Sequence, residues 1–441
     1  MKGIKRCVSM IVFAAIFTSL FAVGAFAEAD EPIHLVFWHG MSGTNGEIIN
    51  YIVETFNESH DGIEVEAQYQ GSYEESINKL KAAMRTQDGP DIVQIYEAGT
   101  RFMVDSDFVI PMQTIIDKYD IDISKLEEHI LDYYTINDQL YSIPLNTSVP
   151  VLYYNKDMLS QVGYEDGPAT WDEIIDASKK VVDAGLATSG IAVSNFAWWF
   201  EQFMVQQRYP MVDNENGRTA PATRCTLMDG DVALKGCEKW LSMYNDGTIA
   251  QIGFDTNDNN AYFWSGQAAM AIDSSGGLRN FLDNIGDSFE LGVAFFPAVD
   301  AESPNGGVTL GGASIYSIDN GRGDSTEAAI AEFVKYVISP EIQAYFHINS
   351  GYYPITTEAY ELEEVKENLE KYPQFQVIVD ELHFSENMGF GAIYGTFVEG
   401  RAVYTQYLQQ MLLGELTPEE ALNKSVEDIN VLIEDYNLAN G

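Results

Sequence analysis

The sequence predicts an α/β protein of two domains with mixed, mainly parallel sheets. Strand-like and helix-like segments alternate from Ile33 to Tyr96, which is typical of strands joined by helical crossovers. A second series of such segments begins after Pro144. The chain has 441 residues, more than one hydrophobic core usually contains, and 46% of them are hydrophobic, so we expect two folded domains.

The first series contains three strands and two helices. Its strands are the apolar run Ile33–Trp38, the alternating segment Ile63–Tyr69 and the segment Asp91–Tyr96. One helix over Glu47–Asn57 has its apolar residues on a single face, and a second runs over Tyr73–Arg85. Because helical crossovers between neighbouring strands are right-handed and leave those strands parallel, we expect a parallel arrangement here.

The second series begins with a strand over Val149–Tyr154. Thr170-Trp171-Asp172-Glu173 has the form of a capping box and predicts a helix to about Ala184. Later patterns predict the strands Ala269–Asp273, Leu291–Phe296 and Ala313–Ile318, then the helices Thr326–Ile338 and Phe397–Leu413 and a last helix capped by Thr417.

The first 27 residues have the features of an export signal. Lys2, Lys5 and Arg6 precede an apolar stretch from Ile11 to Phe26, and Ala25-Phe26-Ala27 has the small residues that signal peptidase accepts. No Cys lies at this cleavage point, so a lipid anchor is not indicated. We therefore expect residues 1–27 to be a signal peptide and the mature chain to be periplasmic or otherwise extracytoplasmic.

The charge excludes two classes of partner. The formal net charge is −43, with 67 acidic and 24 basic residues. Nucleic acids and anionic lipid surfaces both require a cationic protein surface, so neither is an expected partner. The net charge does not identify the charge of a small ligand, because surface charges are screened and a recessed site depends on its own few groups.

Motifs for catalysis, metals or cofactors are not evident in the sequence. None of the six histidines has a second histidine four residues later, and no nucleophile elbow, phosphate loop or dinucleotide fingerprint occurs. Asp255, Asn257 and Asn259 begin like a calcium loop, but Asn260 and Gly266 replace the required Gly and Glu, so we interpret the segment as an exposed turn. Whether Cys225 and Cys237 form a disulfide stays open.

Five segments carry a resemblance to a known family. They are Phe37-Trp38-His39-Gly40-Met41, Ile95-Tyr96-Glu97-Ala98-Gly99-Thr100, Pro150-Val151-Leu152-Tyr153-Tyr154-Asn155-Lys156-Asp157, Gly311-Gly312-Ala313-Ser314 and Gly351-Tyr352-Tyr353-Pro354-Ile355-Thr356. The chain resembles the family 1 extracellular solute-binding proteins of ABC transporters, and most of all the branch that binds sn-glycerol 3-phosphate.

The resemblance implies a two-lobed periplasmic-binding-protein fold with a ligand cleft at the hinge. It divides the chain into a first lobe of residues 28–146 plus about 297–350 and a second lobe of about 147–296 plus 351–441. It also implies a monomeric receptor without a cofactor, which performs no chemistry and delivers its small polar ligand to the transmembrane subunits of an ABC permease.

Seven ligand-binding positions follow from the resemblance: Tyr73, Glu97, Ser148, Ser274, Gly312, Tyr352 and Arg401. Trp38 and Trp171 are candidate apolar walls of the cleft. An Arg fork suits a phosphate dianion, whereas Glu97 suits the hydroxyls of glycerol, so we expect a site with donors at one end and an acceptor at the other. Each residue also has an ordinary explanation; Arg401, for example, is equally explained as an exposed cation that counters Glu399.

Three alternatives for the identity of the ligand stay open at this stage. The ligand is sn-glycerol 3-phosphate, a glycerophosphodiester such as glycerophosphocholine, or an oligosaccharide bound by aromatic surfaces. A secreted enzyme acting on carbohydrate or phosphoesters belongs to a different class, and no catalytic motif in the sequence favours it. For the phosphate site, Arg401→Ala is expected to abolish binding of phosphorylated ligands with little effect on the fold.

Overall fold

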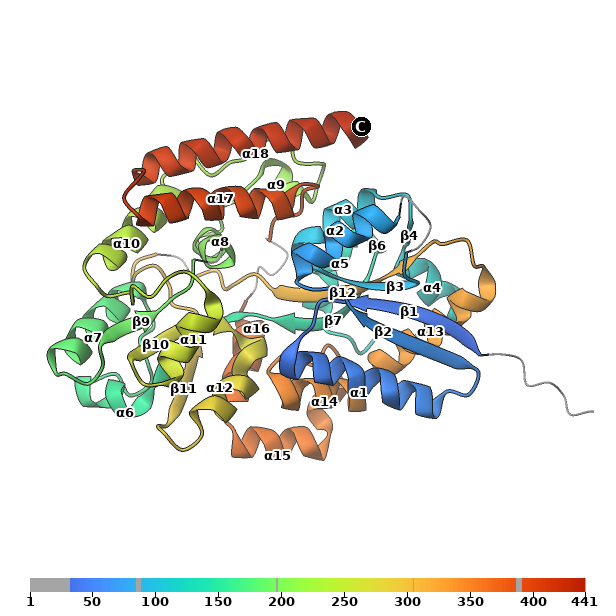
Figure 1. Ribbon diagram of the computed structural model, residues 1–441, viewed down its shortest axis with the longest axis horizontal. Helices are drawn as coiled ribbons and strands as arrows, with labels where there is room; N and C mark the ends of the chain where they lie inside the picture. The colour runs from blue at the N-terminus through green and yellow to red at the C-terminus, as the bar shows by residue number, and fades with distance from the viewer. Residues whose placement is uncertain (1–31, 85–88, 196, 304, 386–390, 441) are drawn as a thin grey trace, which may run out of the picture.

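The computed structural model describes residues 32–84, 89–195, 197–303, 305–385 and 391–440. It has two mixed sheets on opposite sides of the molecule, each surrounded by helices (Figure 1). The α/β class and the mixed sheets are therefore confirmed. The expected signal peptide lies outside the described residues, and none of the described helices is both long and apolar enough to span a bilayer.

The first sheet has the strand order β2-β1-β3-β12-β4, and β7 also pairs with β12. β1 is parallel to β2 and β3, as the helical crossovers predict. β12 is antiparallel to β3, β4 and β7. The strands are β1 (Ile33–His39), β2 (Ile63–Tyr69), β3 (Ile92–Tyr96), β4 (Val109–Ile110), β7 (Ile143–Ser148) and β12 (Gly311–Ile318).

The second sheet has the order β11-β8-β10-β9. β9 and β10 are parallel, whereas β8 is antiparallel to both β10 and β11. A short hairpin, β5 with β6, is antiparallel as well. The strands are β5 (Thr135–Ile136), β6 (Gln139–Leu140), β8 (Pro150–Asn155), β9 (Ser189–Ala192), β10 (Ala268–Ser274) and β11 (Leu291–Phe295).

The expectation of mainly parallel sheets is wrong. Among the strand pairings of the described residues, β1–β2, β1–β3 and β9–β10 are parallel and the others are antiparallel. The reason is that β8 and β12 do not enter their sheets through a helical crossover from a neighbouring strand. Each comes from the other sheet, so the crossover rule does not constrain its direction.

The chain passes between the sheets at two connections. Val149 alone separates β7 of the first sheet from β8 of the second, and residues 296–310 lead from β11 to β12. Val149 is anchored to the turn after β10, because its N–H donates to Ser275 Oγ at 3.2 Å and its carbonyl accepts from Ser275 N at 2.8 Å. The division of the chain into lobes at residues 146, 297 and 351 stays a prediction.

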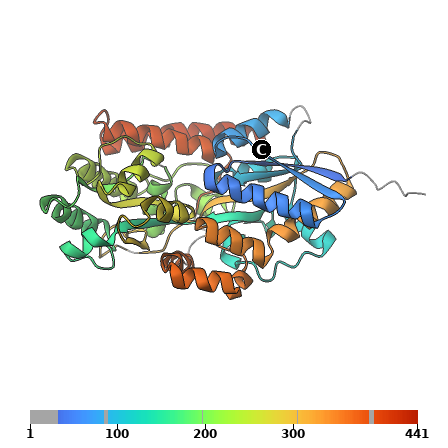
Figure 2. The same ribbon diagram turned by 60° about the horizontal axis from the view of Figure 1, so that its bottom comes forward.

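Helices cover both sheets, and the C-terminal pair reaches across the molecule. α17 packs against α18, against α8 and α10, and against the 3₁₀ turn that follows β3 of the first sheet. Figure 2 shows this red pair running along one edge of the molecule toward the blue half. The helices are α1 (Gly43–Ser59), α2 (Tyr73–Ala83), α3 (Thr100–Asp105), α4 (Met112–Tyr119), α5 (Glu128–Tyr134), α6 (Lys156–Leu159), α7 (Trp171–Asp183), α8 (Ala197–Gln206), α9 (Asp213–Gly217), α10 (Val232–Asn245), α11 (Thr256–Trp264), α12 (Leu278–Ile285), α13 (Asp324–Val337), α14 (Pro340–Ser350), α15 (Glu363–Lys371), α16 (Gln374–Phe384), α17 (Phe397–Leu412) and α18 (Pro418–Asn440).

Two predicted helix caps are present. Thr170 Oγ1 accepts from Glu173 N at 3.2 Å, although the Glu173 carboxylate accepts from Ala169 N instead of completing the box. At α18 the box is complete, since Thr417 Oγ1 accepts from Glu420 N at 3.2 Å and the Glu420 carboxylate accepts from Thr417 N at 2.9 Å.

The segment that resembles a calcium loop is not an exposed turn, and that interpretation is wrong. Asp255 caps α11, because its carboxylate accepts from Asn257 N at 2.8 Å and Asp258 N at 3.2 Å. Asn259 and Asn260 are buried in this helix. The two cysteines, Cys225 and Cys237, are both free and buried.

Candidate functional site

Tyr73 lies at the junction of α2 and the first sheet. A complete capping box at Ser72 begins α2 and places Tyr73 at the first helical position. The Tyr73 ring stacks on Tyr96 with centroids 5.2 Å apart, and its hydroxyl accepts from Asn146 Nδ2 at 3.1 Å. Asn146 is held in turn by Gln94, whose Nε2 donates to Asn146 Oδ1 at 2.7 Å.

Tyr352 reaches the same place from the end of α14. His347 Nδ1 bonds the Tyr352 carbonyl at 2.7 Å, which fixes the backbone, and the Tyr352 side chain hydrogen-bonds with Asn146 and Tyr73. Its ring covers Gly276 so closely that a Cβ there would lie 2.5 Å from it. Burial raises the pKa of Tyr352 to about 12, so the hydroxyl stays neutral and can donate.

Glu97 and Arg401 form a buried ion pair beside these tyrosines. Glu97 opens the 3₁₀ turn after β3, and its Oε1 lies 2.7 Å from Arg401 Nη1. Glu201 of α8 takes the other two nitrogens, with Arg401 Nε and Nη2 donating to its carboxylate oxygens at 2.7 and 2.8 Å. Tyr404 also donates to Glu201. Three segments far apart in the chain therefore meet at one guanidinium.

The electrostatics of this group favour a charged arginine. Burial raises the pKa of Glu97, and Arg401 opposes that rise. Burial lowers the pKa of Arg401, but Glu201 and Glu97 outweigh this effect and its pKa lies above the ordinary value. Arg401 is 7% exposed, Glu97 5% and Glu201 2%, so the guanidinium is the centre of a buried network.

This geometry changes two expectations. Arg401 is not the exposed cation of the ordinary explanation, and its removal leaves two buried carboxylates, so a small effect of Arg401→Ala on the fold is no longer expected. The sequence predicted the acceptor Glu97 and the donor Arg401 at opposite ends of the site. In the structure these two side chains bond each other directly.

The other predicted positions lie on nearby backbone or in the cores. Ser148 ends β7 opposite Gly311, and Gly312 faces Thr147 with φ of +105°. Ser274 ends β10, where its hydroxyl accepts from Gly276 N at 3.2 Å. Trp38 is half-buried and donates from Nε1 to Gln68 at 2.9 Å. Trp171 packs against Phe203 and Phe296 in the core around the second sheet.

The structure thus brings Tyr73, Glu97, Tyr352 and Arg401 into one connected group. Sequence reasoning missed two members, Asn146 and Glu201. Glu201 could have been identified from the sequence, because it is the single charged residue in the apolar helix Ala197–Gln206. In the structure all residues of this helix are buried. A carboxylate in such a helix requires a partner. Among the described residues, no three acidic, His or Cys side chains form a group that could hold a metal ion.

Asp273, next to Ser274, predicts a pH dependence of stability. Its carboxylate accepts from the Asn260 amide and from Ser274 N, yet burial raises its pKa from 3.8 to about 6. The folded state therefore binds this proton more tightly than the unfolded state. The stabilisation is fully present below pH 3.8 and is lost as pH rises through 6, by about 3 kcal/mol in all.

Urea unfolding between pH 3.5 and 7.5 measures this effect. Asp273→Asn should flatten the decline in unfolding free energy over this range, whereas Asp287→Asn, at an exposed position, should keep the wild-type profile. Identical profiles for wild type and Asp273→Asn would contradict the assignment.

Comparison with known proteins identifies relatives over nearly the whole length of the chain. The family model described as bacterial extracellular solute-binding protein matches residues 51–376. The sn-glycerol-3-phosphate-binding periplasmic protein UgpB of Pectobacterium atrosepticum is 30% identical over 442 residues, which cover 98% of this chain and 96% of the relative. The protein of the same name from Brucella abortus is 28% identical over 432 residues, covering 96% and 98%.

Solved structures with the same fold bind different solutes. UgpB from Mycobacterium tuberculosis, in complex with glycerophosphocholine, matches with a TM-score of 0.76 at 20% identity, over 92% of this chain and 99% of that one. The GacH receptor of Streptomyces glaucescens, solved unliganded and with acarbose, matches with a TM-score of 0.75 at 20% identity, again over 92% and 99%. These matches confirm the expected two-lobed fold.

Proposed function

Because this chain belongs to the bacterial extracellular solute-binding protein family, we propose that it captures sn-glycerol 3-phosphate, or a glycerophosphodiester, for an ABC importer. The ligand occupies the junction of the two sheets and is passed to the membrane permease. The observation that carries the proposal is the group of Tyr73, Glu97, Tyr352 and Arg401, which come from distant parts of the chain and meet at that junction.

The phosphoryl group enters between Glu97 and Arg401. Arg401 keeps its two bonds to Glu201, and Nη1 turns from Glu97 to the ligand. Glu97 is then free to accept from the glycerol hydroxyls. Ser148, Ser274 and Gly312 supply neutral donors around the ligand. Trp171 packs in the core around the second sheet and is not a wall of the proposed site. Closure of the lobes is a population shift toward the state that holds ligand better.

The protein is a receptor that acts outside the cytoplasm. Its relatives from P. atrosepticum and B. abortus are named as periplasmic binding proteins. We propose that residues 1–27 direct export, and that the mature chain acts as a monomer. No step of this function requires chemistry on the ligand.

An oligosaccharide is the second candidate ligand, and one observation favours it. Nε, Nη1 and Nη2 of Arg401 all bond carboxylates, so the group presents two formal negative charges for one positive. Such a group suits the hydroxyls of a neutral sugar without rearrangement.

Titration calorimetry on the mature protein distinguishes these ligands. The panel is sn-glycerol 3-phosphate, glycerophosphocholine, glycerol and maltose. We expect one of the phosphorylated solutes to bind at least about tenfold more tightly than glycerol or maltose, a difference of about 1.4 kcal/mol. Preferential binding of maltose would contradict the proposal and support the oligosaccharide receptor. Release of phosphate during long incubation would instead indicate an enzyme.

A further inference from the structure

Three buried polar donors beside the Glu97–Arg401 group have no partner. They are Arg218 Nε, Gln202 Nε2 and Thr309 Oγ1, and none of them bonds any other described atom. Gln202 is 0% exposed and Thr309 2%. A buried donor without an acceptor is costly in a folded protein, so three of them together indicate a missing acceptor.

The three donors are connected around Gly391. Arg218 Nη2 donates to the Gly391 carbonyl at 2.9 Å. A Cβ on Gly391 would lie 2.4 Å from Thr309 Oγ1 and 2.8 Å from the Tyr133 ring. Thr309 N donates to Gln202 Oε1 at 3.0 Å, which identifies the other end of that amide as the free donor.

A strained turn delivers Arg218 to this place. In α9, Asn214, Glu215 and Asn216 all have left-handed backbone angles, with φ of 54°, 54° and 58°. Such a conformation costs roughly 1–2 kcal/mol per residue. It persists because Asn216 Oδ1 accepts from Met211 N at 2.7 Å and from Val212 N at 3.2 Å, and because Ile393 N donates to the Asn216 carbonyl at 2.9 Å.

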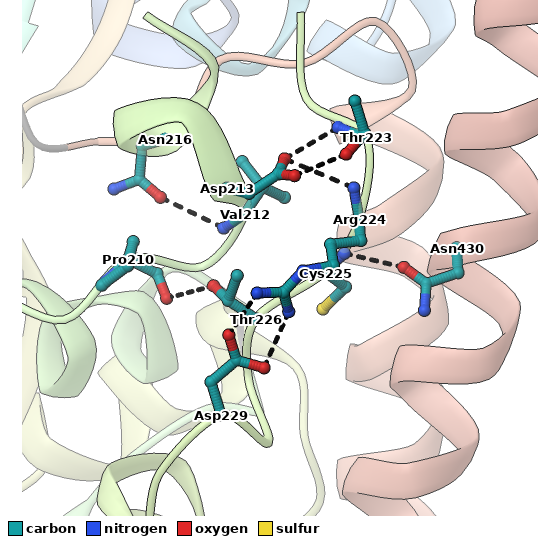
Figure 3. Close-up of polar contacts among 10 residues, drawn as sticks. All are labelled: Pro210, Val212, Asp213, Asn216, Thr223, Arg224, Cys225, Thr226, Asp229 and Asn430. Atoms are coloured by element: carbon teal, nitrogen blue, oxygen red, sulfur yellow. Dashed lines mark hydrogen bonds and ion pairs between the residues drawn. The ribbon is translucent and has the colours of Figure 1, made fainter.

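The base of this turn is tied down separately. As Figure 3 shows, the Asp213 carboxylate accepts from the Thr223 N–H at 2.7 Å, from the Thr223 hydroxyl and from the Arg224 N–H. Strain that is fixed from both sides commonly marks a position where function requires one geometry. Here Arg218 is the C-cap residue of α9, two positions after the last strained residue, Asn216.

Among the described residues no carboxylate bonds the Arg218 side chain directly. Its described contacts are the carbonyls of Tyr133 and Gly391 and the Tyr133 ring, whose centroid lies 4.9 Å from the guanidinium carbon. Burial lowers its pKa, and Asp132 acts on it only by electrostatic attraction that raises the pKa. Arg401, in contrast, bonds two carboxylates. Tyr133 is influenced electrostatically by Glu97, Arg218 and Arg401, so both arginines adjoin one region.

We propose that Arg218, Thr309 and Gln202 form an anion subsite that receives the phosphoryl oxygens of the bound solute. The inference rests on the proposed function and adds the residues that neutralise the phosphate. A guanidinium, an amide and a hydroxyl together offer donors to several oxygens of one phosphoryl group. Water satisfies such donors but adds no negative charge beside the cation, whereas a phosphate supplies both acceptors and charge.

Two variants test the subsite by calorimetry with sn-glycerol 3-phosphate and glycerophosphocholine. Arg218→Gln should weaken binding of the preferred phosphorylated solute by at least about thirtyfold, since one charge-assisted fork is lost. Thr309→Val should weaken it by about tenfold. Because Thr309 Oγ1 has no partner without ligand, Thr309→Val should keep or raise the unliganded melting temperature. If the Thr309 hydroxyl had a purely structural role, Thr309→Val would instead lower the melting temperature.

Arg224→Gln is the matched control. Arg224 belongs to the same segment and bonds Asp229 at 2.7 and 2.6 Å (Figure 3), but its side chain is exposed. This variant removes the same charge and should bind within about twofold of wild type. If Arg218→Gln and Thr309→Val, both folded, also bind within about twofold, the subsite is refuted and the proposed function survives.

The remaining outcomes also decide the question. If Arg218→Gln does not fold, Thr309→Val carries the test alone, because its expected stability is that of wild type or higher. Wild-type protein that binds neither phosphorylated solute contradicts the proposed function itself and the subsite with it.

Discussion

Arg401→Ala is expected to destabilise the unliganded protein by about 3–5 kcal/mol and to abolish binding of phosphorylated solutes. The guanidinium holds two buried carboxylates, Glu97 and Glu201, and both lose their counter-charge at once. Neither carboxylate is exposed enough for water to replace Arg401 without local opening. Urea unfolding at pH 7 measures the first effect and calorimetry the second.

A triple variant separates the charge effect from lost packing. Arg401→Met combined with Glu97→Gln and Glu201→Gln removes every charge of the network while keeping side chains of similar length. We expect it to recover most of the stability that Arg401→Ala loses, because replacing a whole buried ion network costs much less than breaking it. Arg224→Ala, at an exposed ion pair, should unfold at the wild-type urea concentration. Wild-type stability of Arg401→Ala would contradict the buried network.

Gly312→Ala is expected to destabilise the protein by at least about 3 kcal/mol. The residue has φ of +105°, which side chains other than Gly rarely adopt, and a Cβ would lie 1.9 Å from the Asn146 carbonyl oxygen. That oxygen belongs to β7, which is hydrogen-bonded to β12 and cannot move away freely. Since the Asn146 side chain also holds Tyr73 and Tyr352, ligand binding should weaken with stability.

Gly414→Ala is the control for backbone strain alone. Gly414 has φ of +78° but open space around the position of a Cβ. Its substitution should therefore cost only the left-handed penalty of about 1 kcal/mol. Thermal melting of both variants checks the difference, and equal losses would show that the close approach to Asn146 is tolerated.

Local pattern predicted seven of the twelve strands and six of the eighteen α-helices of the described residues, because such a pattern depends only on neighbouring residues. The strand predicted over Ile63–Tyr69 has those bounds, and the helix beginning at Tyr73 begins there; its predicted end at Arg85 lies outside the described residues. The predicted parallel direction was wrong for β8 and β12. Their partners lie far away in the sequence, and nothing in a strand's own residues states which way a distant partner runs.

The sequence predicted some, but not all, of the residues that meet in the candidate site. Residue types matched to family segments identified Tyr73, Glu97, Tyr352 and Arg401, and the structure brings these together. It was not predictable that Arg401 meets Glu201, 200 residues earlier in the chain. The donors at Arg218 and Thr309 meet only through the backbone of Gly391, and no periodicity or motif records such a contact.

The single residue Val149 between β7 and β8 restricts how the two halves can turn. Its backbone exchanges two hydrogen bonds with Ser275, so the link is fastened to the turn that follows Ser274 and lies beneath the ring of Tyr352. We expect a rotation of one sheet against the other about this link to displace that turn. The turn after Ser274 and the connection between the sheets are therefore expected to move together, so a contact that holds this turn would also restrain the angle between the halves.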